Sequence, residues 1–294
     1  MVRLGGVATR SELLEVASRA QITHALAEGS VHRPRRGRFI LPHVDQSLRV
    51  AHELTGVLGL RSAALSYGWK VRTLPERPEV IVPRGRKVRD EARTRATLRR
   101  ALLDPHEVER GVTSPLRTVV DCARHLPFDE ALSVADSALR SGVLCSVDLA
   151  RAASSTQGAG RARVLRVLAN AHRKAANPFE SSLRAIALDV PGLAVVPQVG
   201  VLVAGGLRVV PDLVDVSLGL VLEADSHEFH TGRSRLTSDC WRYDELVLAG
   251  WRLLRFTWEQ VMFQQTWVRS VLERAVALRA AETHKPGDHL APQT

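Results

Sequence analysis

The sequence has few cysteines and no long apolar run, and each shortage argues against a class of protein. Cys122, Cys145 and Cys240 lie far apart and form no CxxC pair. We therefore expect structural thiols rather than a zinc site or a disulfide framework. No segment reaches the roughly 18 uninterrupted apolar residues of a membrane helix, and the first twenty residues show no signal-peptide pattern. These absences predict a cytoplasmic protein with no membrane partner.

The charge is unbalanced towards the positive side. The formal net charge is +10 over 294 residues, and arginine supplies most of the cations. A basic balance favours polyanionic partners, and the planar guanidinium binds two phosphate oxygens at once. A genome rich in G and C, which encodes arginine often, is the alternative explanation. The length suits two or three domains.

Residues 1–45 are predicted to form a winged helix-turn-helix. Thr9 to Glu12 has the pattern of a capping box. Ser18 is expected to cap a second helix that Gly29 ends. Residues 31–41 (VHRPRRGRFIL) are typical of two short strands that turn at Arg36-Gly37. Helix, turn, helix and basic hairpin is the order of a winged helix.

Basic and polar residues of this segment are candidates for contact with double-stranded DNA. Arginines in a hairpin would lie along phosphates and give affinity with little sequence choice. Polar residues on the second helix are candidates for base contact. A solvated basic loop and a protein-binding module remain alternatives. The candidate DNA-binding residues are Arg19, Gln21, His24, Arg33, Arg35, Arg36 and Arg38.

Residues 48–150 are predicted to form an α/β middle region. Residues 84–100 hold eight basic and two acidic side chains, so they are either a second phosphate-binding surface or a solvated helix face. The stretch 152–160 (AASSTQGAG) is typical of a linker or exposed loop. The expected elements of the middle region are helices over 60–67, from 113 and over 128–141, and a strand over 80–82.

Residues 161–282 are predicted to form a third domain, followed by a frayed tail over 283–294. The expected order is helix, three strands, helix, strand, helix, which is the core of the restriction-endonuclease-like fold, a mixed sheet flanked by helices. The whole chain is thus expected to be an α/β multidomain protein.

Three carboxylates are predicted to converge in this last domain. Glu223 and Asp225 share one face of the third strand, because strand side chains alternate. A neighbouring strand can bring Asp212 to about 5 Å from them. Carboxylates this close repel one another unless a divalent cation neutralises them. The pattern predicts a metal site at Asp212, Glu223 and Asp225, with Glu180 as a further ligand. A turn residue at Asp212, a solvated strand end and an exposed helix acid at Glu180 are the alternatives.

The order and spacing of short motifs in this domain resemble a known family. It comprises endonuclease-like domains of unknown function that are related to the very-short-patch-repair (Vsr) mismatch endonucleases, in the PD-(D/E)xK superfamily. The matching pieces cover about residues 177–280. They are Asn177-Pro-x-Glu180, Gln198, Pro211-Asp212, Glu223-x-Asp225, His230, Asp239-x-x-Arg242 and residues 250–256 (GWRLLRF).

The resemblance implies a nuclease that uses Mg²⁺ or Mn²⁺. It implies a cation held by Asp212 and the main-chain carbonyl of Ala224. Asp225 stands where the repair enzymes have the first of two histidines and where the superfamily has its lysine, while His230 matches the second histidine. Arg242 and His230 are the residues left to act on the attacking water or the leaving group. For Arg242, a simple helix pair with Asp239 is the alternative.

The N-terminal segment resembles the winged-helix domain of AbiEi-type antitoxins of type IV toxin–antitoxin systems. Residues 6–9, 18–29 and 35–39 carry this likeness. Two functions therefore remain open. One is a magnesium-dependent endodeoxyribonuclease that hydrolyses phosphodiester bonds. The other is a catalytically inactive, antitoxin-like DNA-binding regulator with a toxin as its partner.

Overall fold

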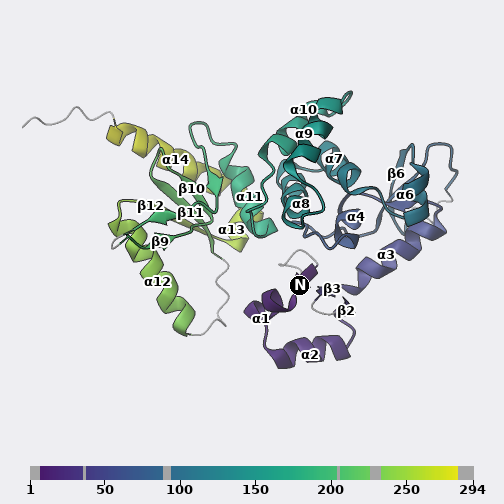
Figure 1. Cartoon of the computed structure of the whole chain (residues 1–294), viewed down its shortest axis with the longest axis horizontal. Helices are drawn as coiled ribbons and strands as arrows, with labels where there is room; N and C mark the ends of the chain where they lie inside the picture. Colours follow the sequence, from purple (N-terminus) through teal and green to yellow (C-terminus); the bar gives the residue numbers. More distant parts are fainter. Residues whose placement is uncertain (1–6, 36–37, 89–93, 204–205, 226–232, 284–294) are drawn as a thin grey trace, which may run out of the picture. The chain divides into compact units, whose positions relative to one another are not determined.

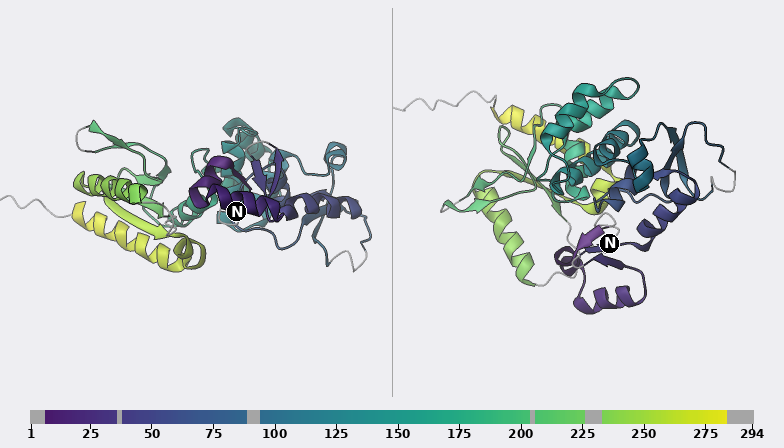
Figure 2. Two further views of the ribbon diagram at one scale, coloured as in Figure 1. Left: turned by 90° about the horizontal axis from the view of Figure 1, so that it is seen from below. Right: turned by 45° about the vertical axis from the view of Figure 1, so that its right-hand side comes forward.

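The chain mixes helices with small sheets and divides into two compact units (Figures 1 and 2). The computed structural model describes residues 7–35, 38–88, 94–203, 206–225 and 233–283. One unit holds the described residues up to Ser182 and residues 233–235, and the other holds those from Leu183 to Asp225 and from Leu236 on. The mixed helix-and-sheet class agrees with the prediction. Within the described ranges, none of the helices has the length and apolar character needed to cross a membrane.

The chain begins with a small antiparallel sheet and two helices. The sheet has the order β1-β3-β2 and pairs Val7 with Ile40. Ala8, Leu13, Val31 and Phe39 form its core. The two helices and the basic hairpin agree with the prediction, whereas β1 was not predicted. The elements are β1 (Val7–Thr9), α1 (Arg10–Val16), α2 (Arg19–Ala27), β2 (His32–Arg35) and β3 (Arg38–Ile40).

A second sheet follows, with the order β4-β5-β6. Strands β5 and β6 run parallel, and Val80 pairs with Leu98. Residues 97–101 therefore form an edge strand, where a helix face had been one of the two expectations. The elements are α3 (Pro42–Glu53), β4 (Val57–Leu58), α4 (Leu60–Ser66), β5 (Glu79–Pro83), β6 (Thr97–Ala101) and α6 (Pro105–Arg110).

A helical core completes the first unit. Trp69, Cys122 and Ala135 are fully buried in it. Val164 and Val167 of the last helix belong to the same core, so the boundary predicted at residue 161 differs from the observed division. The helices are α7 (Pro115–His125), α8 (Phe128–Arg140), α9 (Ser146–Ser155), α10 (Arg161–Asn170) and α11 (Pro178–Ala187), and the division between the units falls inside α11.

The stretch predicted to be a linker is held to the first unit. Residues 152–155 end α9, and Thr156 is buried. Arg124 donates to the carbonyls of Gln157 and Ala159. Both contacts fix the loop that enters α10.

The second unit is built on a four-stranded mixed sheet with the order β12-β11-β10-β7. Strands β11 and β12 run parallel, and the other pairs are antiparallel. A separate two-stranded sheet pairs β8 with β9. The elements are β7 (Val196–Pro197), β8 (Val201–Leu202), β9 (Arg208–Val209), β10 (Leu213–Asp215), β11 (Leu220–Asp225), α12 (Arg233–Leu248), β12 (Arg252–Thr257), α13 (Trp258–Phe263) and α14 (Gln265–Thr283).

Helices cover both faces of the four-stranded sheet. On one face Val214 and Val221 pack with Leu246 of α12. On the other face Phe256 meets Trp267 of α14 edge to face, with the ring centroids 6.1 Å apart. Side chains alternate along β11, so Glu223 and Asp225 lie on the face that α12 covers.

Candidate functional site

Two of the predicted acids lie close together in the second unit, Asp212 directly before β10 and Glu223 on β11. Leu213 pairs with Leu222 across β10 and β11, so Asp212 lies beside Glu223. The Asp212 carboxyl accepts the Ala224 N–H at 2.9 Å through Oδ2. Glu223 is only 2% exposed. The pKa of Asp212 lies above its usual value, because burial raises it more than the hydrogen bonds from Ala224 and Glu223 lower it.

Gln198 supports Asp212 from the loop after β7. Its N–H donates to the Asp212 carbonyl at 3.0 Å, and its side-chain Nε2 lies 3.3 Å from Asp212 Oδ1. The φ of Gln198 is +54°, in the left-handed region that a glutamine seldom adopts. Gln198 is the residue that the resemblance singled out, although the sequence carries no local signal for this backbone.

Two arginines contact the acids of β11. Arg242 of α12 lies 3.4 Å from Glu223 and 3.3 Å from the Tyr243 hydroxyl. Arg255 of β12 forms an ion pair with Asp225. The Arg255 guanidinium also stacks over the Tyr243 ring, 4.1 Å from its centroid. Arg242 was expected to act on the water or leaving group or to pair with Asp239, so its contact with Glu223 was not predicted, and Arg255 and Tyr243 were missed.

Guanidinium groups offset the charge of two of the three predicted acids, because Arg242 pairs with Glu223 and Arg255 pairs with Asp225. Within the described ranges, no group of three or more histidine, cysteine, aspartate or glutamate residues is placed to hold a metal ion. Oxygen donors such as Asp212 and Glu223 have the chemistry that Mg²⁺ and Mn²⁺ prefer, and Asp212 is held in place by two hydrogen bonds.

Glu180, predicted as a further metal ligand, has a structural role as a helix cap. Glu180 belongs to the first unit, where it closes the start of α11 by accepting hydrogen bonds from Ala176 N at 2.9 Å and Asn177 Nδ2 at 2.8 Å. This role as a helix cap explains its burial. His230 lies outside the described residues.

The polar residues of α2 are partly used within the helix itself. The Gln21 side chain accepts the Ser18 N–H at 2.8 Å, and Ser18 Oγ accepts the Gln21 N–H, which completes a capping box. His24 lies 3.1 Å from Glu28. Arg19 is exposed. The amide oxygen of Gln21 is thus committed to the cap, and only its NH₂ group remains to contact a base.

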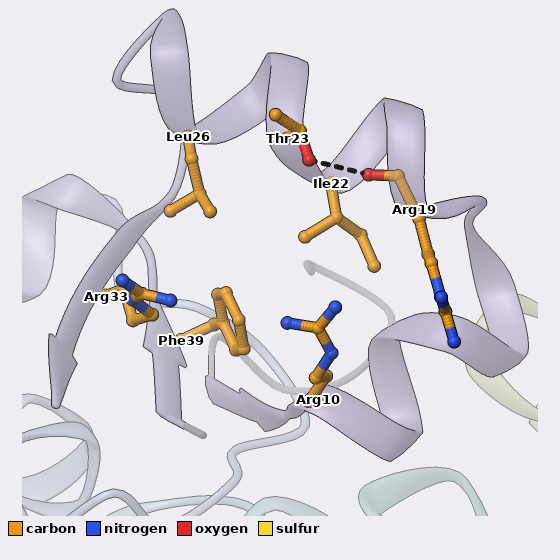
Figure 3. Close-up of a pocket in the computed structure, with 7 residues that line it drawn as sticks. All are labelled: Arg10, Arg19, Ile22, Thr23, Leu26, Arg33 and Phe39. Atoms are coloured by element: carbon orange, nitrogen blue, oxygen red, sulfur yellow. Dashed lines mark hydrogen bonds between the residues drawn. The ribbon is translucent and has the colours of Figure 1, made fainter. Parts of the chain in front are cut away.

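A pocket lies next to α2, and two of the predicted DNA-binding arginines line it. Arg19 and Arg33 share the pocket with Arg10, which had not been singled out (Figure 3). The side chains of Arg35 and Arg38, and the whole of Arg36, lie outside the described residues.

The basic stretch of the middle region is exposed where the structure describes it. Arg84, Arg86 and Lys87 point to solvent, and Arg95 pairs with Glu53 at 2.6 Å. It remains a candidate phosphate surface on the edge of the β4-β5-β6 sheet.

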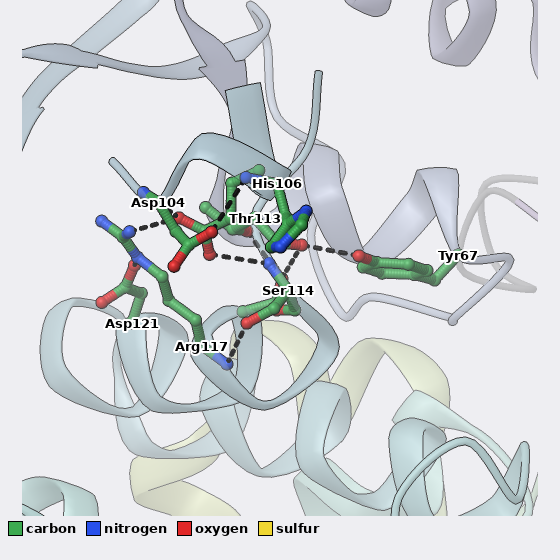
Figure 4. Close-up of polar contacts among 9 residues, drawn as sticks. Tyr67, Asp104, His106, Thr113, Ser114, Arg117 and Asp121 are labelled. Carbon is green, nitrogen blue, oxygen red and sulfur yellow. Dashed lines mark hydrogen bonds and ion pairs between the residues drawn. The ribbon is translucent and has the colours of Figure 1, made fainter. Parts of the chain in front are cut away.

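A polar network between α6 and α7 has a structural explanation (Figure 4). Glu107 accepts hydrogen bonds from the Ser114 N–H at 2.9 Å and from Arg117. Arg117 also contacts Asp121 at 3.3 Å, and the Tyr67 hydroxyl donates to the Thr113 carbonyl at 2.6 Å. These contacts cap the two helices and pin the turn between them, so we assign them to stability.

Comparisons with known proteins assign no family. No protein-family model matches the chain, and no curated protein matches its sequence. Among solved structures, the chain is similar to the RV2827C protein from Mycobacterium tuberculosis, at 15% sequence identity and a TM-score of 0.33. The match covers 60% of this chain and 74% of that one. A likeness this weak carries no argument about fold or function.

Proposed function

We propose that the protein binds double-stranded DNA through its N-terminal segment and hydrolyses phosphodiester bonds at the Asp212–Glu223 pair with a divalent cation. The observation that carries the proposal is the proximity of these two carboxyl groups, one directly before β10 and one on the neighbouring strand β11, where burial raises the pKa of Asp212. Such a site gains from a bound cation, because the cation removes the cost of keeping both acids ionised.

The surrounding architecture supports the same proposal. A mixed sheet with helices on both faces is the arrangement expected of a restriction-endonuclease-like domain. The helices and hairpin of the first forty residues follow the order of a winged helix. The exposed arginines of that segment would contact phosphates.

The residues at the site have separable roles in this proposal. Asp212 and Glu223 would hold Mg²⁺ or Mn²⁺. A strand residue directs its N–H and C=O to the same side, so the Ala224 carbonyl would be the third oxygen donor. The cation supplies polarisation of the phosphate and a lower pKa for the attacking water. Arg242 would offset charge on the substrate phosphate.

A second candidate is a catalytically inactive, antitoxin-like DNA-binding regulator. The pairing of Glu223 with Arg242 and of Asp225 with Arg255 favours it, because two guanidinium groups already offset acids that a metal would otherwise neutralise. The lysine of the PD-(D/E)xK pattern is also missing.

Cleavage of supercoiled plasmid DNA separates the two candidates. We expect nicking with Mg²⁺ or Mn²⁺, no nicking with EDTA, and loss of nicking in Asp212→Asn. Asp244→Asn is the matched control, since Asp244 is an exposed acid on α12 and should keep full activity. Duplex binding without any nicking would support the regulator, and equal nicking by Asp212→Asn would place the activity elsewhere.

A further inference from the structure

Exposed cations gather where two parallel strands of the first unit end. Strands β5 and β6 run parallel and pair Val82 with Arg100, so both reach the same end of the sheet, and β6 is its outer strand (Figure 1). After β5 the chain makes a turn in which the Arg86 N–H donates to the Pro83 carbonyl at 3.0 Å. Arg84 lies in this turn. We call these exposed cations the β5–β6 patch: Arg84, Arg86, Lys87 and Arg100.

The spacing within the β5–β6 patch suits a row of phosphates. Arg84 follows Val82 by two residues, and Val82 pairs with Arg100. Neighbouring strands lie about 4.8 Å apart and rise about 3.3 Å per residue, so the Cα atoms of Arg84 and Arg100 lie within about 10 Å of each other. Each strand of B-DNA carries one phosphate per about 3.4 Å of helix axis, so the two guanidinium groups can reach nearby phosphates of one strand.

No acid neutralises this patch in the ranges that the structure describes. None of its four cations forms an ion pair there. By contrast, Arg61 of the same unit pairs with Glu79 at 2.7 Å. Arg72 pairs with Asp129 at 2.8 Å. A solvated surface usually mixes charges of both signs, whereas the β5–β6 patch carries one sign and attracts anions.

The positive charge continues on the other face of β6. Arg99 and Arg100 point to opposite faces, because side chains alternate along a strand. Within the described residues, Arg99 forms no ion pair either. The pKa of His125 lies below its usual value, because burial and the positive charge of Arg99 both disfavour the protonated imidazole. Both faces of the outer strand therefore carry positive charge that no acid offsets.

We propose that the β5–β6 patch binds the phosphate backbone of double-stranded DNA. Proteins that bind single strands add aromatic side chains on which bases stack, and residues 84–110 contain no phenylalanine, tyrosine or tryptophan. The neighbouring helix α3 contains none either. Contacts to phosphates alone give affinity with little sequence preference. The proposal goes beyond the proposed function, which places duplex contact in the N-terminal segment, and it does not depend on the metal site.

Binding isotherms of the full chain with a short duplex, measured in EDTA over a range of salt concentrations, test the proposal. The double variant Arg84→Gln/Arg100→Gln should flatten the dependence of log K on log salt by about 0.9 per lost phosphate contact, and at about 0.1 M salt it should weaken binding at least about tenfold. The control Arg151→Gln/Arg173→Gln removes two exposed arginines of the same unit and should leave slope and affinity unchanged. Equal melting temperatures would show that both variants fold.

Several outcomes would overturn the proposal. Equal slopes in the patch variant and the control would mean that only net charge matters. Loss of affinity for a single strand with affinity for the duplex kept would make a single strand the partner. The variant Arg84→Lys/Arg100→Lys keeps both charges and should keep the salt slope, so a loss there as large as with glutamine would mean that phosphate contact is not the cause.

The basic hairpin of the N-terminal segment separates this proposal from the proposed function. Alanine at Arg35, Arg36 and Arg38 tests duplex contact by the hairpin. If the patch variant weakens duplex binding and the hairpin variant does not, the patch stands and the N-terminal contact fails. The reverse result would overturn the patch alone.

Discussion

Burial and hydrogen bonding shift the pKa of Asp212 in opposite directions. Burial raises its pKa, while the Ala224 N–H, Glu223 and the charge of Arg242 lower it. An asparagine fits the same place. Its oxygen can accept the Ala224 N–H, and its NH₂ group can donate to Glu223. The Asp212→Asn variant therefore removes the charge with little change of shape.

The raised pKa of Asp212 makes the stability of the protein depend on pH in a definite direction. A protonated Asp212 stabilises the folded state fully below its unfolded pKa of about 3.9, and this contribution is lost as pH rises through the folded-state pKa. Asp212→Asn cannot ionise. Its free energy of unfolding, relative to the parent, should therefore increase from pH 4 to pH 8 in metal-free urea titrations. If the difference in free energy of unfolding between Asp212→Asn and the parent stayed constant with pH, burial would not raise the pKa of Asp212.

The two arginines at the site should contribute unequally to stability. Arg242→Gln leaves the carboxylate of Glu223, only 2% exposed, without its cation, which should cost about 2 kcal/mol. Arg255→Gln breaks a more exposed ion pair with Asp225 and should cost less than about 1 kcal/mol. Urea unfolding of both variants measures the difference. Equal losses would mean that Glu223 does not depend on Arg242.

Among the secondary-structure elements, the helices with strong capping signals and the short strands of the basic hairpin were predicted, whereas the short strands β1 and β4 were not. Ser18 caps α2 and Ser114 caps α7, and both helices were expected from these residues. Strand β1 has only three residues, and β4 has two. Pairing partners far along the chain make them strands, as Val57 pairs with Ile81. No local pattern encodes such partners.

The candidate site was predictable to the extent that it follows from alternation along a strand. That rule put Glu223 and Asp225 on one face of β11, next to the segment that carries Asp212. It could not show that Asp225 would pair with Arg255, because this depends on the parallel register of β11 and β12. The contact between Tyr243 of α12 and Arg255 of β12 could not be predicted either, because it depends on how the helix packs on the sheet.

The β2–β3 hairpin is the element whose contact with DNA can be tested by itself. Alanine at Arg35, Arg36 and Arg38 should weaken duplex binding and flatten its dependence on salt by about one unit per lost phosphate contact. Binding isotherms across a range of salt concentrations measure this slope. An unchanged slope would mean that the hairpin does not touch phosphates.

At the scale of the whole molecule, the two units have cores of their own, and α10 belongs to the first. Val164 and Val167 of α10 are buried with residues of α4, α7 and α8. A fragment that starts at Arg161 would expose this apolar face and should aggregate.

The full chain should resist proteolysis within residues 152–160, because Thr156 is buried and Arg124 holds the loop. Rapid cleavage there that releases a soluble, cooperatively folded fragment would contradict this division.

The melting temperature of the full chain with and without millimolar Mg²⁺ or Mn²⁺ tests the proposed metal site most directly. A cation that binds only the folded state stabilises it by RT ln(1 + [L]/Kd), about 2.7 kcal/mol at a hundred times Kd. We predict a rise of several degrees in the parent and in the Asp244→Asn control, and none in Asp212→Asn. If neither ion changed the melting temperature of the parent, there would be no metal site at Asp212 and Glu223.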